Sequence, residues 1–287
     1  MKRSRVMAVI VAVAAAALVV GAATAAGPSP GTIVGFGGAL STDGKVRFVA
    51  VTSAHDTIVE KIDTRTGRVL RFGSIRGGYG IPLAAFDGTT TALTHDGKAI
   101  VLSTFPGQGI FTRFAVFDTS KLQIRDQVSL RGTWSLDALS PDGSTLFLIQ
   151  YLSTQDTISY RVRAYDLRAD KLVAGAIVDK SDPAAMTGLP MTRVSAADAA
   201  WAYTLYSRNA GYGDKKSSAF IHALDTKNRA AVCIDLPWTA GPDAVSRVHM
   251  SLTSEGLVLT QPGVGRLAVV DLQSYKVQTL RAPVGSP

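Results

Sequence analysis

Residues 135–152 read SLDALSPDGSTLFLIQYL, and this stretch predicts a β-strand, a tight turn and a second β-strand. The turn is expected at Pro141-Asp142-Gly143, because proline presets φ, aspartate hydrogen-bonds its own backbone and glycine accepts positive φ. Residues 146–152 are apolar on both faces of the second strand, which indicates burial on both sides. The stretch therefore predicts an antiparallel strand pair in the interior of an all-β protein.

The same unit recurs along the chain. An Asp-Gly or Glu-Gly pair, with Ser or Thr two positions before the acid, occurs at Asp43, Asp96, Asp142 and Glu255, and a degenerate copy at Asp198. A second mark consists of an apolar residue, then Asp, then Thr or Leu. Its aspartates are Asp63, Asp118, Asp166, Asp225 and Asp271, and their mean spacing is 52 residues. Regular repetition on this scale is typical of propellers and solenoids.

Each repeat contains four strand-like runs. In the second repeat they are residues 89–93, 99–105, 111–117 and 122–130, and in the third residues 135–139, 146–152, 160–165 and 172–178. No segment after residue 26 has a long apolar stripe of helical period, so no helix is expected there. A four-stranded antiparallel sheet that is apolar on both faces needs a neighbour on each side, which a closed ring supplies. The sequence thus predicts an all-β, five-bladed β-propeller whose ring closes without exchanging strands between its ends.

The Ser-x-Asp-Gly turn, followed after the third strand by apolar-Asp-Thr, resembles the repeats of YVTN-type and WD-repeat-like β-propellers of secreted bacterial proteins. The resemblance covers about residues 33–281 and implies the fold, with little about activity. The Trp-Asp dipeptide and the Gly-His pair of WD repeats are absent, and the fourth repeat lacks its glycine. Five blades are expected, since six or seven would need strands that the sequence does not show.

The first 26 residues have the organisation of a secretory signal peptide. Three basic residues stand within the first five, residues 6–20 are almost wholly apolar, and small residues follow at 22–26. The sequence predicts export, a secreted or cell-surface location, and a single mature domain at residues 27–287. The alternative is an uncleaved signal anchor, because residues 6–26 are long enough to span a bilayer; a membrane contact is expected only in that case.

Composition and charge indicate a folded domain without a nucleic-acid partner. The chain has 287 residues, of which 46% are hydrophobic and 18% charged. Loss of the three basic residues of the signal lowers the formal charge from +8 to +5. The remaining Lys and Arg are scattered, so the charge is interpreted as a solubility feature, with attraction to anionic cell-surface polymers as the alternative.

Motifs for metals and cofactors are not found. Cys233 is the only cysteine, and its apolar neighbours predict a buried thiol within a strand. The four histidines share no metal-ligand spacing. Residues 263–268 match the letters of a dinucleotide fingerprint, but residues 266–272 predict a strand where that motif needs a helix. No metal or other cofactor is therefore predicted.

A binding site is expected at one end of the propeller. A four-stranded blade places the turns between its second and third strands, and the links between blades, at the same end. Those connections are long and irregular here, so we call this the loop-rich end, and binding residues usually gather on such loops. Candidate ligand-binding residues near the blade links are Arg76, Tyr79, Arg131, Trp134, Trp238 and Arg247. The alternative for the two tryptophans is that they fill the seams between blades.

Two further candidate ligand-binding residues, Arg193 and His249, lie on the expected innermost strands.

Two classes of function fit the sequence. The preferred one is an exported, non-catalytic propeller that binds a protein, glycan or envelope ligand at the loop-rich end. The alternative is a hydrolase with its site in the central channel. A glycosidase needs two carboxylates, and the innermost strands offer only Asp137, with Asp87 just before one of them. A lactonase-like site, by analogy with propellers that hydrolyse sugar lactones, would use His249 with Arg193 or Arg247. We expect Asp137 and Arg193 to form a structural ion pair.

Overall fold

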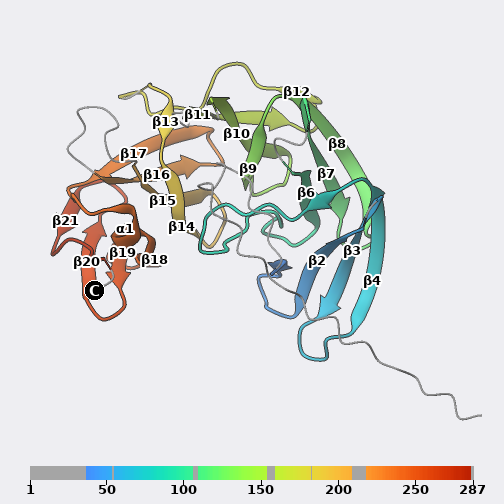
Figure 1. Cartoon of the computed structure of the whole chain (residues 1–287), viewed down its shortest axis with the longest axis horizontal. Helices are drawn as coiled ribbons and strands as arrows, with labels where there is room; N and C mark the ends of the chain where they lie inside the picture. Colours follow the sequence, from blue (N-terminus) through green and yellow to red (C-terminus); the bar gives the residue numbers. More distant parts are fainter. Residues whose placement is uncertain are drawn as a thin grey trace, which may run out of the picture.

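Five antiparallel β-sheets follow one another along the chain and are arranged around a common centre (Figure 1). The computed structural model describes residues 37–53, 55–105, 109–153, 159–181, 183–208 and 218–285, so the expected signal segment lies outside the described residues. Strands that are neighbours in a sheet are also neighbours in sequence, and each sheet is a four-stranded meander, with one additional short strand on the third. The predicted five-bladed, all-β propeller is confirmed.

The blades are numbered in chain order. Blade 1 consists of β1 (Ala39–Leu40), β2 (Val46–Thr52), β3 (Asp56–Asp63) and β4 (Val69–Arg76). Blade 2 consists of β5 (Tyr79–Gly80), β6 (Ala99–Thr104), β7 (Phe111–Asp118) and β8 (Gln123–Arg131). Blade 3 consists of β9 (Trp134–Leu139), β10 (Thr145–Ser153), β11 (Ser159–Asp166) and β12 (Lys171–Leu172), with β13 (Met186–Thr187) also on β11. Blade 4 consists of β14 (Leu189–Ser195), β15 (Trp201–Ser207), β16 (Ala219–Asp225) and β17 (Ala230–Leu236). Blade 5 consists of β18 (His249–Thr253), β19 (Gly256–Gln261), β20 (Gly265–Val270) and β21 (Val277–Thr279).

The two sequence marks of the repeat are joined by hydrogen bonds. The hydroxyl two residues before the acid donates to its carboxylate: Ser41 to Asp43 at 2.7 Å, Thr94 to Asp96 at 2.8 Å and Ser140 to Asp142 at 2.7 Å. The threonine of the second mark donates to a carbonyl of the first turn: Thr64 to Gly44 at 2.7 Å, Thr119 to Gly97 at 2.5 Å and Thr226 to Ala199 at 2.7 Å. The marks therefore fasten the turn between strands one and two to the turn between strands three and four, at the end of the blade opposite the loop-rich end.

The hydrophobic core lies in the seams between blades. One cluster of buried side chains spans blades 1 to 3, two smaller clusters join blades 3 and 4, and another joins blades 4 and 5. Trp134 and Trp238 are 3% and 1% exposed and belong to these clusters. Both tryptophans thus fill seams, and the alternative interpretation of these two residues is the correct one.

Three expected elements differ from the structure. The innermost strand of blade 2, expected at residues 89–93, is instead β5, supplemented by a single bridge from Leu93 to Ile100. Residues 81–92 between them cross the middle of the molecule (Figure 1), where the Phe86 N–H donates to the Pro190 carbonyl at 2.9 Å. Proline at position 82 has no N–H to continue the ladder on β6, which explains why β5 ends there.

The outermost strand of blade 3, expected at residues 172–178, is reduced to β12 and one bridge at Ile177, because Gly175 adopts φ +79° and interrupts the extended backbone. A helix was not expected, yet α1 (Pro242–Ser246) forms one turn with proline at its start, where the missing N–H has no cost. No helix among the described residues has the length and apolarity needed to cross a membrane.

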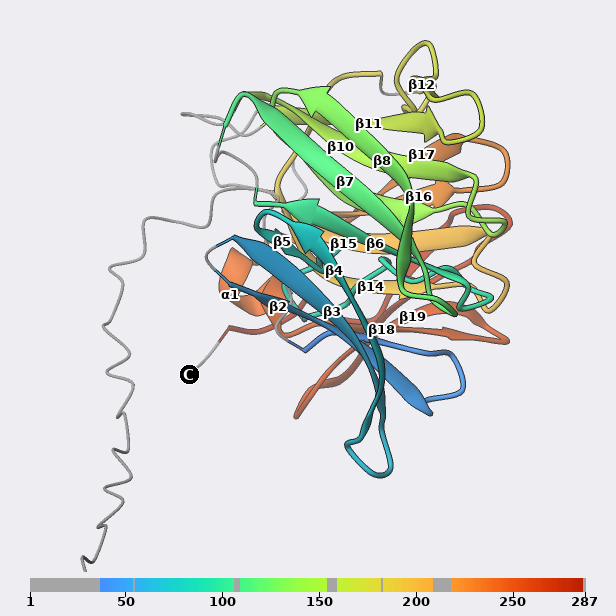
Figure 2. The ribbon, with the colours of Figure 1, turned by 90° about the vertical axis from the view of Figure 1, so that its right-hand side faces the viewer.

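Blades 1 and 5 lie at the two ends of the arc of sheets (Figure 1). Within the described residues, no hydrogen bond, ion pair or core cluster joins these two blades, so the expected closure between them is not found there. The face of blade 1 turned away from blade 2 carries Leu40, Val51 and Phe72, which are 51%, 54% and 70% exposed, together with the charged Arg47 and Glu60. Figure 2 shows the β3–β4 hairpin of this blade projecting from the body.

Candidate functional site

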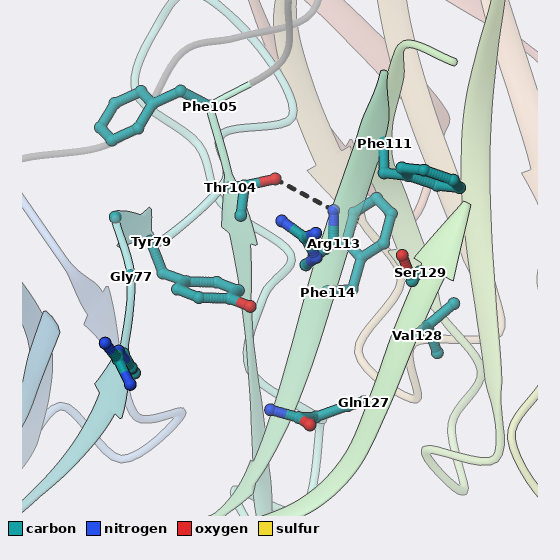
Figure 3. A pocket seen from close by; sticks show the side chains of 12 residues that line it. Gly77, Tyr79, Thr104, Phe105, Phe111, Arg113, Phe114, Gln127, Val128 and Ser129 are labelled. Atoms are coloured by element: carbon teal, nitrogen blue, oxygen red, sulfur yellow. Dashed lines mark hydrogen bonds between the residues drawn. The ribbon is translucent and has the colours of Figure 1, made fainter. Parts of the chain in front are cut away.

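A cavity of about 510 Å³ lies at the loop-rich end of the seam between blades 1 and 2 (Figure 3). Its lining comes from the link between the two blades and from β6, β7 and β8. The lining residues are Arg76, Gly77, Gly78, Tyr79, Thr104, Phe105, Phe111, Arg113, Phe114, Gln127, Val128 and Ser129. Cavities of about 300–1,000 Å³ are the usual size of small-molecule sites. The structure thus brings two of the predicted ligand-binding residues, Arg76 and Tyr79, to one cavity.

Two threonines of blade 1 hold the link in place. The buried Thr57 hydroxyl accepts the Tyr79 N–H at 2.8 Å and donates to the Gly77 carbonyl at 2.8 Å. The Thr52 hydroxyl donates to the Tyr79 carbonyl at 2.7 Å. Gly77 has φ +108°, and a Cβ there would lie 3.3 Å from the Tyr79 ring, so glycine is required at this position. The link therefore presents the Tyr79 ring to the cavity in one orientation.

Aromatic rings form much of the cavity wall. Tyr79 and Phe114 are 5% and 1% exposed, whereas Phe105 is half-buried and Phe111 is exposed at the rim. In Figure 3, Tyr79 and Phe111 lie on opposite sides of Arg113. Phe105 and Phe111 are therefore the rings with surface available to a flat apolar group, whereas Tyr79 and Phe114 form the packed inner wall.

The cavity is positively charged. Arg76 and Arg113 line it, and none of its twelve lining residues is an aspartate or glutamate. Burial raises the pKa of Tyr79, and the nearby positive charge of Arg113 opposes this shift. The phenol therefore keeps its proton at neutral pH and can donate a hydrogen bond. The backbone N–H of Arg113 donates to the Thr104 hydroxyl at 3.0 Å (Figure 3), which fixes where its side chain leaves β7.

Sequence reasoning missed the part of the cavity that comes from β6, β7 and β8. Phe111 and Arg113 alternate on β7, directly after the long connection at residues 106–110, and both are exposed. An exposed aromatic residue and an exposed arginine at alternate positions beside a long loop were the available signal. Only the pairing of β7 with β8 adds Gln127 and Ser129 to the same wall.

The other predicted site residues lie elsewhere. Trp134 donates its indole N–H to the Arg131 carbonyl at 2.9 Å in the seam between blades 2 and 3, and Arg131 itself is exposed. Trp238 is buried, Arg247 is half-buried just after α1, and His249 is exposed on β18, the innermost strand of blade 5. None of these five residues lines the cavity of Arg76 and Tyr79.

The ion pair expected between Asp137 and Arg193 is confirmed. Arg193 Nη1 lies 2.6 Å from Asp137 Oδ1, and the two side chains are 0% and 1% exposed. Asp87 Oδ2, from the segment that crosses the centre, accepts the Arg193 backbone N–H at 3.3 Å. Arg193 therefore joins blades 3 and 4 in the interior and does not present its guanidinium to a ligand in the channel.

A polar row continues from Arg193 across blade 4. Arg193, Thr204, His222 and Cys233 are successive cross-strand neighbours, and the first three are almost fully buried. Cys233 Sγ lies 3.8 Å from His222 Nδ1, and the thiol is half-buried on β17 rather than fully buried as expected. Burial lowers the pKa of His222 to about 4, so its imidazole is neutral at pH 7. Sequence patterns do not show this row, because the register between strands decides which residues become cross-strand neighbours.

A second, smaller cavity of about 180 Å³ lies at the inner ends of blades 1 to 4. Its lining consists of Ala, Leu, Thr and Ser side chains together with His95, and includes no carboxylate. Among the described residues, no three His, Cys, Asp or Glu side chains are grouped so that they could hold a metal ion.

Comparisons with known proteins add a likeness in shape. No protein-family model matches the sequence, and no curated protein matches it. Among solved structures, Kuenenia stuttgartiensis hydrazine synthase is 16% identical over 83% of this chain and 77% of its own, with a TM-score of 0.43. TolB from Acinetobacter baumannii is 14% identical over 71% of this chain and 43% of its own, with a TM-score of 0.41. An uncharacterized protein from Listeria monocytogenes EGD-e is 8% identical over 90% of this chain and 85% of its own, with a TM-score of 0.44. Likeness at this level carries no functional argument.

Proposed function

We propose that the chain is an exported, non-catalytic β-propeller that binds a ligand in the cavity between blades 1 and 2. The observation that carries the proposal is the cavity itself, with its size, its aromatic wall and its place at the loop-rich end. Export is supported by the signal-like organisation of residues 1–26. A ligand outside the cytoplasm, either a soluble molecule or a group on an envelope glycan or protein, fits this location.

A binding role also agrees with the chemistry of the lining. The twelve lining residues include hydroxyls but no His, Asp, Glu, Cys or Lys that could act as a base beside them. Of the two arginines in the lactonase-like alternative, Arg193 is engaged with Asp137 in the interior, which leaves only Arg247 to act with His249. The groups that converge in the described structure are thus suited to hold a molecule.

The experiment that tests the proposal is a titration of residues 27–287 with small aromatic probes, benzoate and benzamide, followed by NMR. We expect saturable binding that is weakened at least ten-fold by Ser129→Trp, because the indole fills the cavity. Gln123→Trp is the matched control, since Gln123 is also exposed on β8 but lies outside the lining. Gln127→Trp provides a second cavity-filling variant if the first one folds poorly.

Equal binding by both cavity-filling variants and the control would contradict the proposal. Hydrolysis of a lactone or of a 4-nitrophenyl glycoside by the unmodified protein, lost on substitution of His249, would instead support the hydrolase alternative.

A further inference from the structure

We infer that the ligand of the cavity between blades 1 and 2 carries an anionic group, such as a carboxylate, phosphate or sulfate, attached to a flat apolar ring. This inference rests on the proposed function and adds the chemical class of the ligand. It is argued from the charge, the partners and the surroundings of the lining residues.

The two guanidinium groups of the cavity have no partner among the described residues. Within the described residues, the side chains of Arg76 and Arg113 make no hydrogen bond and no ion pair, although both line the same space. Three other exposed arginines pair with a nearby carboxylate: Arg125 with Asp126 at 2.7 Å, Arg168 with Asp142 at 3.0 Å and Arg266 with Glu255 at 2.8 Å. Arg47, Arg71 and Arg131 are exposed and unpaired within the described residues, so what distinguishes Arg76 and Arg113 is that they line one cavity. The lining therefore contributes two positive charges and no carboxylate; Asp56, the cross-strand neighbour of Arg76, lies outside the lining and forms no ion pair with it in the described structure.

The surroundings favour binding of an anion over simple solvation of these charges. Tyr79 and Phe114 are almost fully buried, so the inner wall is packed protein, and a charge-assisted hydrogen bond is stronger than a neutral one. The protonated Tyr79 hydroxyl and the exposed Ser129 hydroxyl add neutral donors near the arginines. Guanidinium groups match the planar oxygens of carboxylate and the oxygens of phosphate.

The rest of the ligand is indicated by the rings. Phe105 and Phe111 have exposed ring surface in the same cavity as the two cations, and the almost fully buried Tyr79 lines it beside them. Aromatic contacts and cation–π interactions both favour a planar partner. An anionic group next to a flat ring therefore satisfies the charged and the aromatic parts of the wall together.

The inference is tested with two probes of nearly equal shape and different charge, benzoate and benzamide, on residues 27–287. We expect benzoate to bind about ten-fold more tightly at low salt, as for a hydrogen bond to a charged group, and this preference to shrink as NaCl screens the arginines. Arg113→Gln and Arg76→Gln should each remove most of the preference while changing benzamide binding less than two-fold. Arg113→Lys, which keeps the charge, should retain part of it.

Arg65→Gln is the control, because Arg65 is exposed in the β3–β4 turn outside the lining. Equal affinity for the two probes, with Ser129→Trp still abolishing both, would overturn the inference and leave the proposed function standing. Failure of both probes to bind would overturn the proposed function and the inference together. A benzoate preference that survives both Gln substitutions would also overturn the inference.

Discussion

Asp137 on β9 and Arg193 on β14 join blades 3 and 4 through a 2.6 Å contact from which solvent is excluded. Such a pair adds little net stability when both charges are present, because desolvation offsets their attraction. Removal of one partner is costly, since it leaves the other charge buried and unpaired. Asp137 Oδ2 and two further guanidinium nitrogens of Arg193 lack a hydrogen-bond partner among the described residues. The contact between Arg193 Nη1 and Asp137 Oδ1 is therefore the main compensation for burying the two charges.

Asp137→Ala should therefore lower the free energy of unfolding by about 3–5 kcal/mol. The double variant Asp137→Leu with Arg193→Met should lose clearly less, because no buried charge remains. Urea unfolding followed by tryptophan fluorescence measures both. Glu255→Gln, in the exposed pair with Arg266, should leave the urea midpoint unchanged. Equal losses in the single and double variants would show that packing, and not the unpaired charge, sets the cost.

His222 gives the fold a defined dependence on pH. Its pKa is lowered from 6.5 to about 4, mainly by burial, with Asp137, Arg193 and Asp179 as the nearby charges. Between pH 6.5 and pH 4 the unfolded chain binds a proton at His222 that the folded protein does not bind. Stability from this group is therefore complete above pH 6.5 and falls as the pH is lowered towards 4.

Between pH 7.5 and pH 5, the wild type should lose about 2 kcal/mol more unfolding free energy than His222→Gln, which cannot titrate. Urea unfolding at the two pH values gives this difference, and His95→Asn, at an exposed histidine, serves as the control. A pH dependence that is identical in wild type and His222→Gln would mean that His222 is not protonated differently in the two states.

At the scale of elements, blades 1 and 2 pack closely where β4 meets the β7–β8 turn. A Cβ on Gly73 would overlap the carbonyl oxygen of Leu122, a residue held at φ +51° by that turn. Glycine is therefore needed for the two blades to pack at this distance, and the cavity lies in the same seam.

Gly73→Ala should lower the free energy of unfolding by about 1–3 kcal/mol, the usual cost of overpacking, because the blades must move apart. Gly241→Ala is the control, since a Cβ there meets nothing within 4 Å. Thermal or urea unfolding is the measurement. Equal stability of the two variants would show that the packing between blades 1 and 2 accommodates the extra methyl group without loss of unfolding free energy.

The sequence predicted elements wherever a local signal was present. The turns with Ser or Thr before Asp-Gly are recognisable because their hydrogen bonds are made within a few residues. The errors at residues 89–93 and 172–178 fall where strand pairing is only one or two residues long. A strand as short as β5 has no periodicity to detect, and its position is set by the threonines of blade 1.

At the scale of the whole molecule, the two ends of the arc differ in polarity. On the free face of blade 1, Phe72 pairs across the strands with Glu60 and Val49 and is 70% exposed. On blade 5, the row of His249, Thr260 and Arg266 is polar. An exposed apolar sheet face contributes little to folding and attracts apolar molecules.

Phe72→Lys should therefore change the free energy of unfolding by no more than about 0.5 kcal/mol and should lower the fluorescence of an apolar dye such as ANS. Ile110→Lys, at a residue that is also 70% exposed but lies outside this sheet face, should leave the dye signal nearly unchanged. A marked loss of stability in Phe72→Lys would mean that the face is covered in solution.

The repeat spacing was sufficient to predict the number of blades and which end carries the long loops. Two of the twelve lining residues followed as well, because Arg76 and Tyr79 stand beside a recognisable blade link. Beyond the aromatic residue and the arginine at alternate positions after residues 106–110, the sequence holds no signal for the other lining residues, since Phe114 and Ser129 reach the cavity only through the packing of blade 2 on blade 1. Contacts between distant segments depend on register and on the angle between sheets, and neither is encoded in a local pattern.

The most direct test of the central claim is a crystal structure of residues 27–287 grown with benzoate. The account predicts the carboxylate between the guanidinium groups of Arg76 and Arg113, with the ring against Tyr79 or Phe111. Benzoate found in the central channel beside His95, or a cavity that stays empty at saturating benzoate, would contradict it.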